Sequence, residues 1–279
     1  MHLDGRYANG KRDRRKGNHK SRWQRKRNRG MLGHIMTKEL QLDHLRGVLV
    51  RLEETIIFGL IERAQFRRNP PVYETGGMGG ALGSKSLLEF MLHETERLHA
   101  QVRRYTSPDE HPFFDDLPEP ILPSLAYAEN PLHKNRVNVN AQIMRMYVDE
   151  LVPFISADGD DANYGSCAVI DVHLLQALSK RIHYGMFIAE SKYREERSTF
   201  DPLIRANDQA AIEAAITVTH VECQLYERVS RKAAAYGSEL LNAGDGSIAP
   251  EKVRAIYERW IIPPCKQVEV AYLLQRLNG

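Results

Sequence analysis

From residue 43 onward the apolar residues recur almost throughout at the spacing of one face of an α-helix. The run DHLRGVLVRLEETIIFGLIERAQF places Leu45, Leu49, Ile56 and Leu60 on one broad stripe and meets no helix stop before Asn69-Pro70-Pro71. Further helices are predicted at residues 86–105, 140–155, 167–193, 208–236, 250–262 and 265–277. No alternating strand pattern and no fixed-period repeat persists, so the sequence predicts an all-α fold.

The chain is long enough for a full-sized core, and its charge is divided very unevenly. Residues 1–30 contain twelve Lys or Arg against two Asp, a balance of +10. Because the whole chain carries +3, the remaining 249 residues carry −7. We therefore expect a basic, disordered N-terminal extension over 1–35 and one all-helical domain over 36–279.

The basic extension has three possible interpretations. It could bind nucleic acid or serve as a nuclear address, it could be a dispensable arm, or translation could begin at Met31 or Met36. Nucleic-acid binding by the acidic remainder is not expected.

Several apparent motifs do not support a metal or nucleotide site. The glycine-rich GGMGGALGSKS lacks the spacing of a phosphate loop and no apolar strand leads into it. His93 and His99 are six residues apart and face different sides of their helix, which excludes the i, i+4 zinc pair. The three cysteines have no metal-type spacing and fit a reducing compartment. With no apolar run long enough for a membrane span and no secretory signal, an intracellular protein is expected.

Charged residues within apolar helical stripes are the strongest functional signal. In SKRIHYGMFIAESKY, Arg181 and Lys192 stand eleven residues apart and so share one face about three turns apart, with Gly185 between them. Arg46, Glu222 and Glu269 are embedded similarly. Each alone could be an exposed charge or a core ion pair. Together they suggest helices that converge on a small, polyanionic ligand. Arginine can bind the carboxylates of such a ligand through two parallel N–H groups.

Long segments of the chain also resemble a known family. The segments LRGVLVRLEETIIFGLIERAQFRRNPPVYE, VRRYTSPDEHPFFDDLP, DGDDANYGSCAVIDVHLLQALSKRIHYGMFIAESK and IIPPCKQVEVAYLLQRL are similar, in order, to the all-helical chorismate mutases of fungi and plants. The resemblance runs from about Asp43 to Leu277. It implies a cofactor-free, cytoplasmic isomerase that converts chorismate to prephenate in phenylalanine and tyrosine biosynthesis.

The resemblance assigns roles to the embedded charges. Arg46 and Arg181 would hold the two carboxylates of chorismate, while Lys192 and a protonated Glu269 would donate to its ether oxygen. Glu222 would accept from the ring hydroxyl. We expect Gly185 to leave space for the ring.

Two pocket positions depart from the fungal pattern. Val218 replaces an Asn one turn before Glu222, and Cys265 replaces a Thr one turn before Glu269. A neutral hydrogen bond is worth about 1 kcal/mol, whereas a donor to charge that develops in the transition state is worth about 3 kcal/mol, so an active enzyme is still expected. The alternative is a catalytically silent, mutase-like binding or regulatory protein.

The same resemblance implies an allosteric homodimer with tryptophan and tyrosine as effectors. The residues that match the family's effector site are Arg103, Arg104, Asn163, Gly165 and Ser166. An ordinary basic helix end is the competing interpretation of the two arginines. Ala249 replaces a Thr that fungal relatives carry before Pro250, which leaves the strength of switching open.

Overall fold

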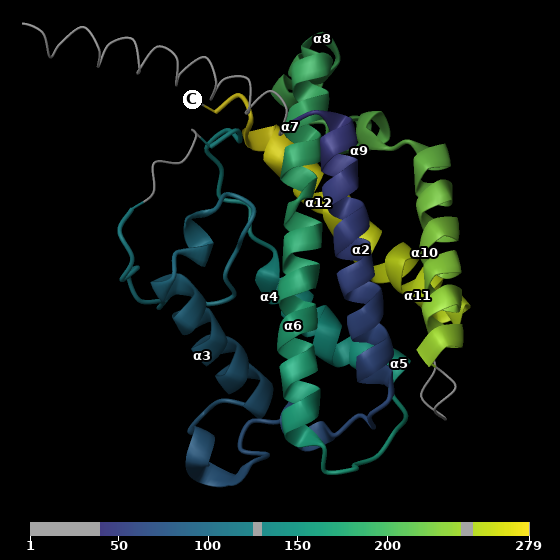
Figure 1. The fold of residues 1–279 in the computed structure, drawn as a ribbon. Coiled ribbons are helices and arrows are strands. Elements are labelled where there is room, and N and C mark those ends of the chain that lie inside the picture. The colour runs from purple at the N-terminus through teal and green to yellow at the C-terminus, as the bar shows by residue number, and fades with distance from the viewer. Residues whose placement is uncertain (1–39, 125–129, 241–247, 279) are drawn as a thin grey trace, which may run out of the picture. The chain divides into compact units, whose positions relative to one another are not determined.

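The computed structural model describes residues 40–124, 130–240 and 248–278, with side chains omitted for 238–240. These residues belong to one compact unit that begins at Leu40. Every regular element in the described ranges is helical, which confirms the predicted all-α fold (Figure 1). The predicted extension over residues 1–35 and the domain boundary at residue 36 lie outside the described residues. Among the described helices, none has both the length and the apolar character needed to span a membrane.

The described residues form a series of helices in chain order. The α-helices are α2 (Leu42–Ala64), α3 (Leu87–Gln101), α4 (Asn140–Met146), α5 (Val152–Ile155), α6 (Tyr164–His183), α7 (Gly185–Glu195), α8 (Arg197–Arg205), α9 (Gln209–Ile216), α10 (Thr219–Leu240), α11 (Pro250–Ile256) and α12 (Ile262–Gln275). Short 3₁₀ turns lie at Pro70–Val72, Gly79–Leu82 and Arg104–Thr106. The described residues between the last of these turns and α4, 107–124 and 130–139, contain no regular helix.

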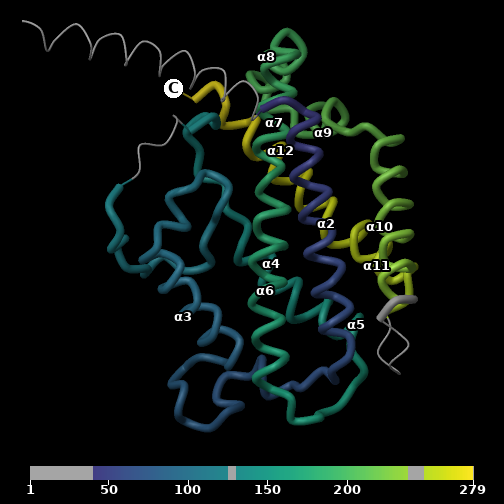
Figure 2. Tube along the Cα trace, viewed as in Figure 1, coloured from purple at the N-terminus to yellow at the C-terminus, as the bar shows by residue number. Residues whose placement is uncertain are grey.

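Helices α2 and α6 lie side by side and run in opposite directions at the centre of the unit (Figure 1). Gly59 of α2 permits this approach, because a Cβ atom there would stand 2.7 Å from Cδ2 of Leu174. From α6 the chain continues into α7 through Tyr184, which keeps helical dihedral angles (Figure 2). As a result α6 and α7 form a nearly continuous helix, called the α6–α7 rod below. The sequence predicts one helix over residues 167–193.

A buried ion pair fixes α2 against α6. Nε of Arg63 lies 2.9 Å from Oδ1 of Asp171, and both side chains are fully buried. The Asp171 carboxylate also accepts hydrogen bonds from the hydroxyl groups of Tyr73 and Tyr147, each at 2.6 Å. The remaining guanidinium nitrogens of Arg63 donate to Tyr73 and to the carbonyls of residues 66–68. Such complete pairing offsets the cost of taking two charges out of water.

The prediction of a single helix over 208–236 is wrong. The chain turns to extended geometry at Thr217, with ψ at 121°, so α9 ends at Ile216 and α10 begins at Thr219. The break falls within Ile-Thr-Val-Thr, a run of β-branched residues that lose side-chain freedom in a helix. The sequence reading also missed α8, in which Pro202 lies inside the helix. Pro202 is the sixth of the nine residues of α8, so it removes the N–H that would bond to the carbonyl of residue 198, and the helix continues for three more residues.

Two π-helical segments, Tyr147–Leu151 and Tyr257–Ile261, interrupt otherwise continuous helices. The second joins α11 directly to α12, whose first turn contains Pro263 and Pro264. Proline is tolerated there because the first N–H groups of a helix have no intrahelical partner. The predicted helices at 250–262 and 265–277 therefore form a single bent rod rather than two separate elements.

Candidate active site

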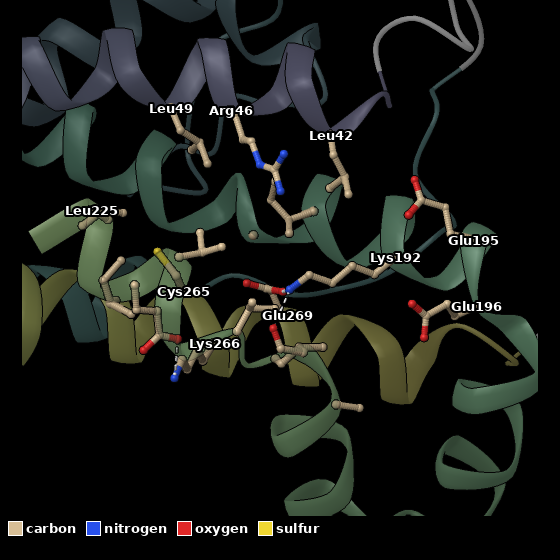
Figure 3. A pocket seen from close by; sticks show the side chains of 18 of the residues that line it. Leu42, Arg46, Leu49, Lys192, Glu195, Glu196, Leu225, Cys265, Lys266 and Glu269 are labelled. Carbon is tan, nitrogen blue, oxygen red and sulfur yellow. Dashed lines mark hydrogen bonds and ion pairs between the residues drawn. The ribbon is translucent and has the colours of Figure 1, made fainter. Parts of the chain in front are cut away.

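One pocket of about 300 Å³ collects all eight residues predicted for substrate binding. Its walls come from α2, the α6–α7 rod, the α9–α10 break and α12 (Figure 3). The predicted residues that line it are Arg46, Arg181, Gly185, Lys192, Val218, Glu222, Cys265 and Glu269. Apolar side chains, including Leu42, Leu49, Ile188 and Leu225, complete the lining. The pocket is thus a mostly apolar cleft with a few polar groups, the usual composition of a small-molecule site.

Arg181 is buried without a counter-ion. Only 4% of the residue is exposed, yet within the described part of the chain no carboxylate lies within 4.0 Å of its guanidinium. Nη1 lies 3.1 Å from Sγ of Cys265, and Nε has no hydrogen-bond partner. A buried cation that lacks a partner is costly, which indicates that an anionic ligand completes the site.

Lys192 and Glu269 meet in the centre of the pocket. Nζ of Lys192 lies 3.0 Å from Oε2 of Glu269 and donates to the backbone carbonyl of Ile216 at 2.7 Å. Burial is the largest influence on the Glu269 carboxyl and raises its pKa, although the positive charges of Lys192 and Arg181 oppose this. The net direction is upward, so Glu269 takes up a proton more readily than an exposed glutamate does.

A second lysine and glutamate pair lies at the other side of the pocket. Nζ of Lys266 on α12 stands 2.7 Å from Oε1 of Glu222 on α10, and both side chains are about one-fifth exposed. The sequence reading missed Lys266, although its position one turn before Glu269 on the same helix was a usable signal. It also missed Glu195 and Glu196, which line the pocket near the α7–α8 junction.

Arg46 and Val218 occupy more exposed parts of the lining. The side chain of Arg46 is 57% exposed and lies 3.1 Å from Asp43 on the preceding turn of α2. Figure 3 shows Arg46 reaching from α2 toward Lys192 and Glu269. Val218 is 41% exposed and lies at the break between α9 and α10. An exposed pair such as Arg46 and Asp43 is weak, so Arg46 can exchange Asp43 for a ligand carboxylate at little cost.

Cys265 and Gly185 form the tight floor between α7 and α12. The Cys265 thiol is buried, which raises its pKa to about 11 despite the nearby charge of Arg181. A Cβ atom on Gly185 would stand 2.9 Å from the carbonyl oxygen of Cys265 and 3.2 Å from Cγ of Glu269. Close helix packing is therefore one reason for this glycine. Its predicted role in leaving room for a ring stays a prediction.

Glu53 joins α10 to α2 behind the pocket. Its buried carboxylate accepts from Arg228 at 2.7 and 2.9 Å and lies 3.2 Å from Nζ of Lys232. These contacts hold α10, which carries Glu222, against α2, which carries Arg46. Within the described residues no group of three or more His, Cys, Asp or Glu side chains could hold a metal ion.

The predicted effector residues lie outside this pocket in two separate places. Arg103 adopts a left-handed conformation, with φ at 70°, after the end of α3, and Nη1 of Arg104 contacts Gln176 in the middle of α6 at 3.1 Å. Asn163 precedes the first turn of α6, which contains Gly165 and Ser166. At 1.5 Å per residue, Gly165 and Gln176 are about 16 Å apart along the axis of α6. One chain therefore does not bring the two sets together.

Comparison with known proteins identifies the family. The model for chorismate mutase type II matches residues 163–270. The chorismate mutase of Schizosaccharomyces pombe is 45% identical over 250 residues, which cover 87% of this chain and 99% of the relative. The chain belongs to the chorismate mutases. It is accordingly an isomerase that converts chorismate to prephenate, and the predicted family is confirmed.

Solved chorismate mutases share the fold as well as the sequence. A chorismate mutase from Candida albicans in complex with L-Trp superimposes with a TM-score of 0.82 at 42% identity, covering 87% of this chain and 94% of its own. AtCM1 with tyrosine bound in its allosteric site gives a TM-score of 0.79 at 44% identity, covering 86% and 97%. The all-helical architecture is thus that of the chorismate mutases.

The packing at Gly185 predicts the effect of a single methyl group. Gly185→Ala should lower the free energy of unfolding by about 1–3 kcal/mol, because the new Cβ would press on the backbone of α12. Because α12 carries Glu269 and Cys265, we also expect kcat for chorismate to fall. Urea unfolding and an absorbance assay of chorismate loss measure the two effects.

Gly47→Ala in α2 is the matched control. Its Cβ would meet only the Arg51 side chain, at an ordinary 3.8 Å, and alanine in a helix is favoured over glycine by about 1 kcal/mol. Wild-type stability and kcat in Gly185→Ala would show that α12 does not depend on this close approach.

Proposed function

We propose that chorismate binds in this pocket with its two carboxylates on Arg46 and Arg181. The observation that carries the proposal is the buried guanidinium of Arg181, which has no carboxylate partner among the described residues. Arginine can bind a carboxylate through two parallel N–H groups, which fixes both the position and the orientation of the substrate. Arg46, at the more exposed side, takes the second carboxylate.

The rearrangement itself needs orientation and charge stabilisation. As the ether C–O bond of chorismate breaks and a new C–C bond forms, negative charge develops on the ether oxygen, and no atom is gained or lost. Lys192 and protonated Glu269 donate to that oxygen. Fixed donors aimed at developing charge in a site with little water are worth several kcal/mol of barrier.

Glu222 is the proposed acceptor for the ring hydroxyl of chorismate. Its carboxylate lines the same pocket as Arg46, and the pair of Glu53 and Arg228 holds α10 against α2. The apolar side chains between these charges surround the carbon skeleton and exclude water from it.

Removal of the unpartnered arginine should separate activity from stability. Arg181→Met should lower kcat/KM for chorismate by at least about 100-fold, which corresponds to about 3 kcal/mol. The free energy of unfolding should stay the same or rise, because the change removes a buried charge that has no counter-ion. The assay is chorismate turnover followed by absorbance, paired with urea unfolding.

Arg254→Met, which breaks an exposed pair with Glu258, serves as the control and should change neither property by much. Retention of near wild-type kcat/KM in Arg181→Met would refute the role of Arg181 in substrate binding.

The proposed donor role of Glu269 predicts a pH dependence. Only the protonated carboxyl can donate, and burial raises its pKa, so activity is present below that pKa and falls as the pH rises through it. Glu269→Gln donates an N–H group at every pH and should flatten the alkaline decline. The measurement is kcat/KM from pH 4 to 9 for both proteins, and an identical decline in the variant would exclude this role.

We further propose a homodimer whose effector site combines residues of two copies. Support comes from the separation of the two effector sets along α6 and from exposed apolar side chains near them. Leu98, Val102 and Ile121 gather at the end of α3, where the backbone N–H of Ile121 donates to the carbonyl of Gln101, and Val169 is 57% exposed on α6. Exposed apolar surface of this kind is typical of an interface between subunits.

Tryptophan should activate the enzyme and tyrosine should inhibit it, if the two effector sets meet across such a dimer. Arg104→Ala should abolish both responses while basal turnover persists, because Arg104 lies outside the substrate pocket. Turnover at subsaturating chorismate, with each amino acid added, measures the response, and light scattering measures the mass. A monomer, or a dimer insensitive to both amino acids, would contradict the proposal.

A cytoplasmic location also remains a proposal. The three cysteines, none of which forms a disulfide, are compatible with a reducing compartment. Cell fractionation with an antibody against the full chain tests it.

A further inference from the structure

We propose that Lys266 is a positioning residue for the rearrangement, whose ammonium group holds the Glu222 carboxylate in place to accept the substrate's ring hydroxyl. The inference rests on the role proposed above for Glu222. It adds a residue of the described pocket that neither the sequence reading nor the family resemblance assigned.

The contact is short and exclusive. Nζ of Lys266 stands 2.7 Å from Oε1 of Glu222, and within the described chain neither side chain has another ion-pair or hydrogen-bond partner. Figure 3 shows Lys266 extending from α12 toward the carboxylate that it pairs with, on the side away from Lys192. One carboxylate oxygen of Glu222 is thus occupied and the other is left for a ligand.

The charge balance of the site also requires a cation at this place. A bare Glu222 carboxylate would repel a substrate that carries two carboxylates, and this repulsion is stronger in a partly desolvated pocket than in water. Lys266 offsets that repulsion and leaves Glu222 an anionic acceptor. The pocket therefore contains two lysine and glutamate pairs, one for the ether oxygen and one for the hydroxyl.

Lys266 also faces Glu269, which lies three residues further along α12. The charged groups that act on Glu269 are Lys192 from α7, Arg181 from α6 and Lys266 from α12, and all three lower its pKa against the larger effect of burial. Loss of the Lys266 charge should therefore raise the pKa of Glu269 further. This shift follows from the charge of Lys266 itself, so it reports that Lys266 lies near Glu269, and the positioning of Glu222 is tested by the double-mutant cycle and by rescue with Lys266→Arg.

A merely structural pair predicts a different outcome. Both side chains are about one-fifth exposed, and partly exposed pairs of that kind contribute little to stability. Lys266→Met keeps the length of the side chain and removes its charge, so the folded state should persist.

The test is a double-mutant cycle of Lys266→Met and Glu222→Gln, measured as kcat and KM for chorismate. Lys266→Met should lower kcat/KM about tenfold and shift the alkaline decline to higher pH. Glu222→Gln should have a larger effect, and the double variant should be no worse than Glu222→Gln alone, because Lys266 acts through Glu222. Lys266→Arg should recover most of the activity, and Lys252→Met, an exposed lysine outside the pocket, should behave as wild type.

Each other outcome has a definite meaning. Multiplicative losses in the double variant would show that Lys266 acts independently of Glu222, for example on the substrate, and would overturn the positioning role. A low activity in Glu222→Gln with wild-type behaviour in Lys266→Met would overturn the inference alone. Wild-type activity in Glu222→Gln would refute the proposed role of Glu222 and the inference with it.

Discussion

The buried pair of Arg63 and Asp171 sets the register of α2 against α6, and the active site depends on that register. Both oxygens of Asp171 and every nitrogen of the Arg63 guanidinium have partners, so a shift of either helix would leave buried charges unsatisfied. Because α2 and α6 run in opposite directions, the start of α2 and the end of α6 come to the same end of the unit. That arrangement brings Arg46 and Arg181 to one pocket.

Arg63 of α2 and Arg181 of α6 are both buried, but their environments differ. The difference distinguishes an arginine that stabilises the fold from one that is available to a ligand. Arg63 is saturated by one carboxylate, one hydroxyl and three carbonyls. Arg181 contacts a thiol sulfur and retains an unpartnered Nε. Complete pairing is what a structural buried charge needs, whereas incomplete pairing in a pocket is what a substrate-binding charge needs. Burial alone would not distinguish them.

Helical periodicity predicted the features of the site that lie within one helix or rod. It placed Arg181 and Lys192 on the same face, and the structure brings both to the pocket because Tyr184 keeps helical geometry between α6 and α7. It could not predict the pairing of Lys266 with Glu222, because that contact joins α12 to α10 and depends on how the helices pack. It also joined residues 208–236 into one helix, because apolar spacing continues through Thr217 although the backbone does not.

The arrangement of the effector residues could not be predicted from the sequence either, because it depends on how helices and subunits pack. The sequence similarity selects Arg103 and Arg104 together with Asn163, Gly165 and Ser166, but a single chain holds these sets about 16 Å apart along α6. No sequence pattern states whether such a distance is closed by a second subunit.

The two unusual pocket residues differ in how much they can matter, because their burial differs. Val218 is 41% exposed, so a group that the missing amide would have bound can turn to water instead. Cys265 is buried, and its thiol stays protonated at neutral pH because burial raises its pKa to about 11. Its sulfur accepts from Nη1 of Arg181 at 3.1 Å and its S–H group points to the carbonyl of the same residue at 3.7 Å. The exchange of Thr for Cys at this position therefore changes the contacts of Arg181, the arginine proposed to bind substrate, and leaves the charged residues of the pocket in place.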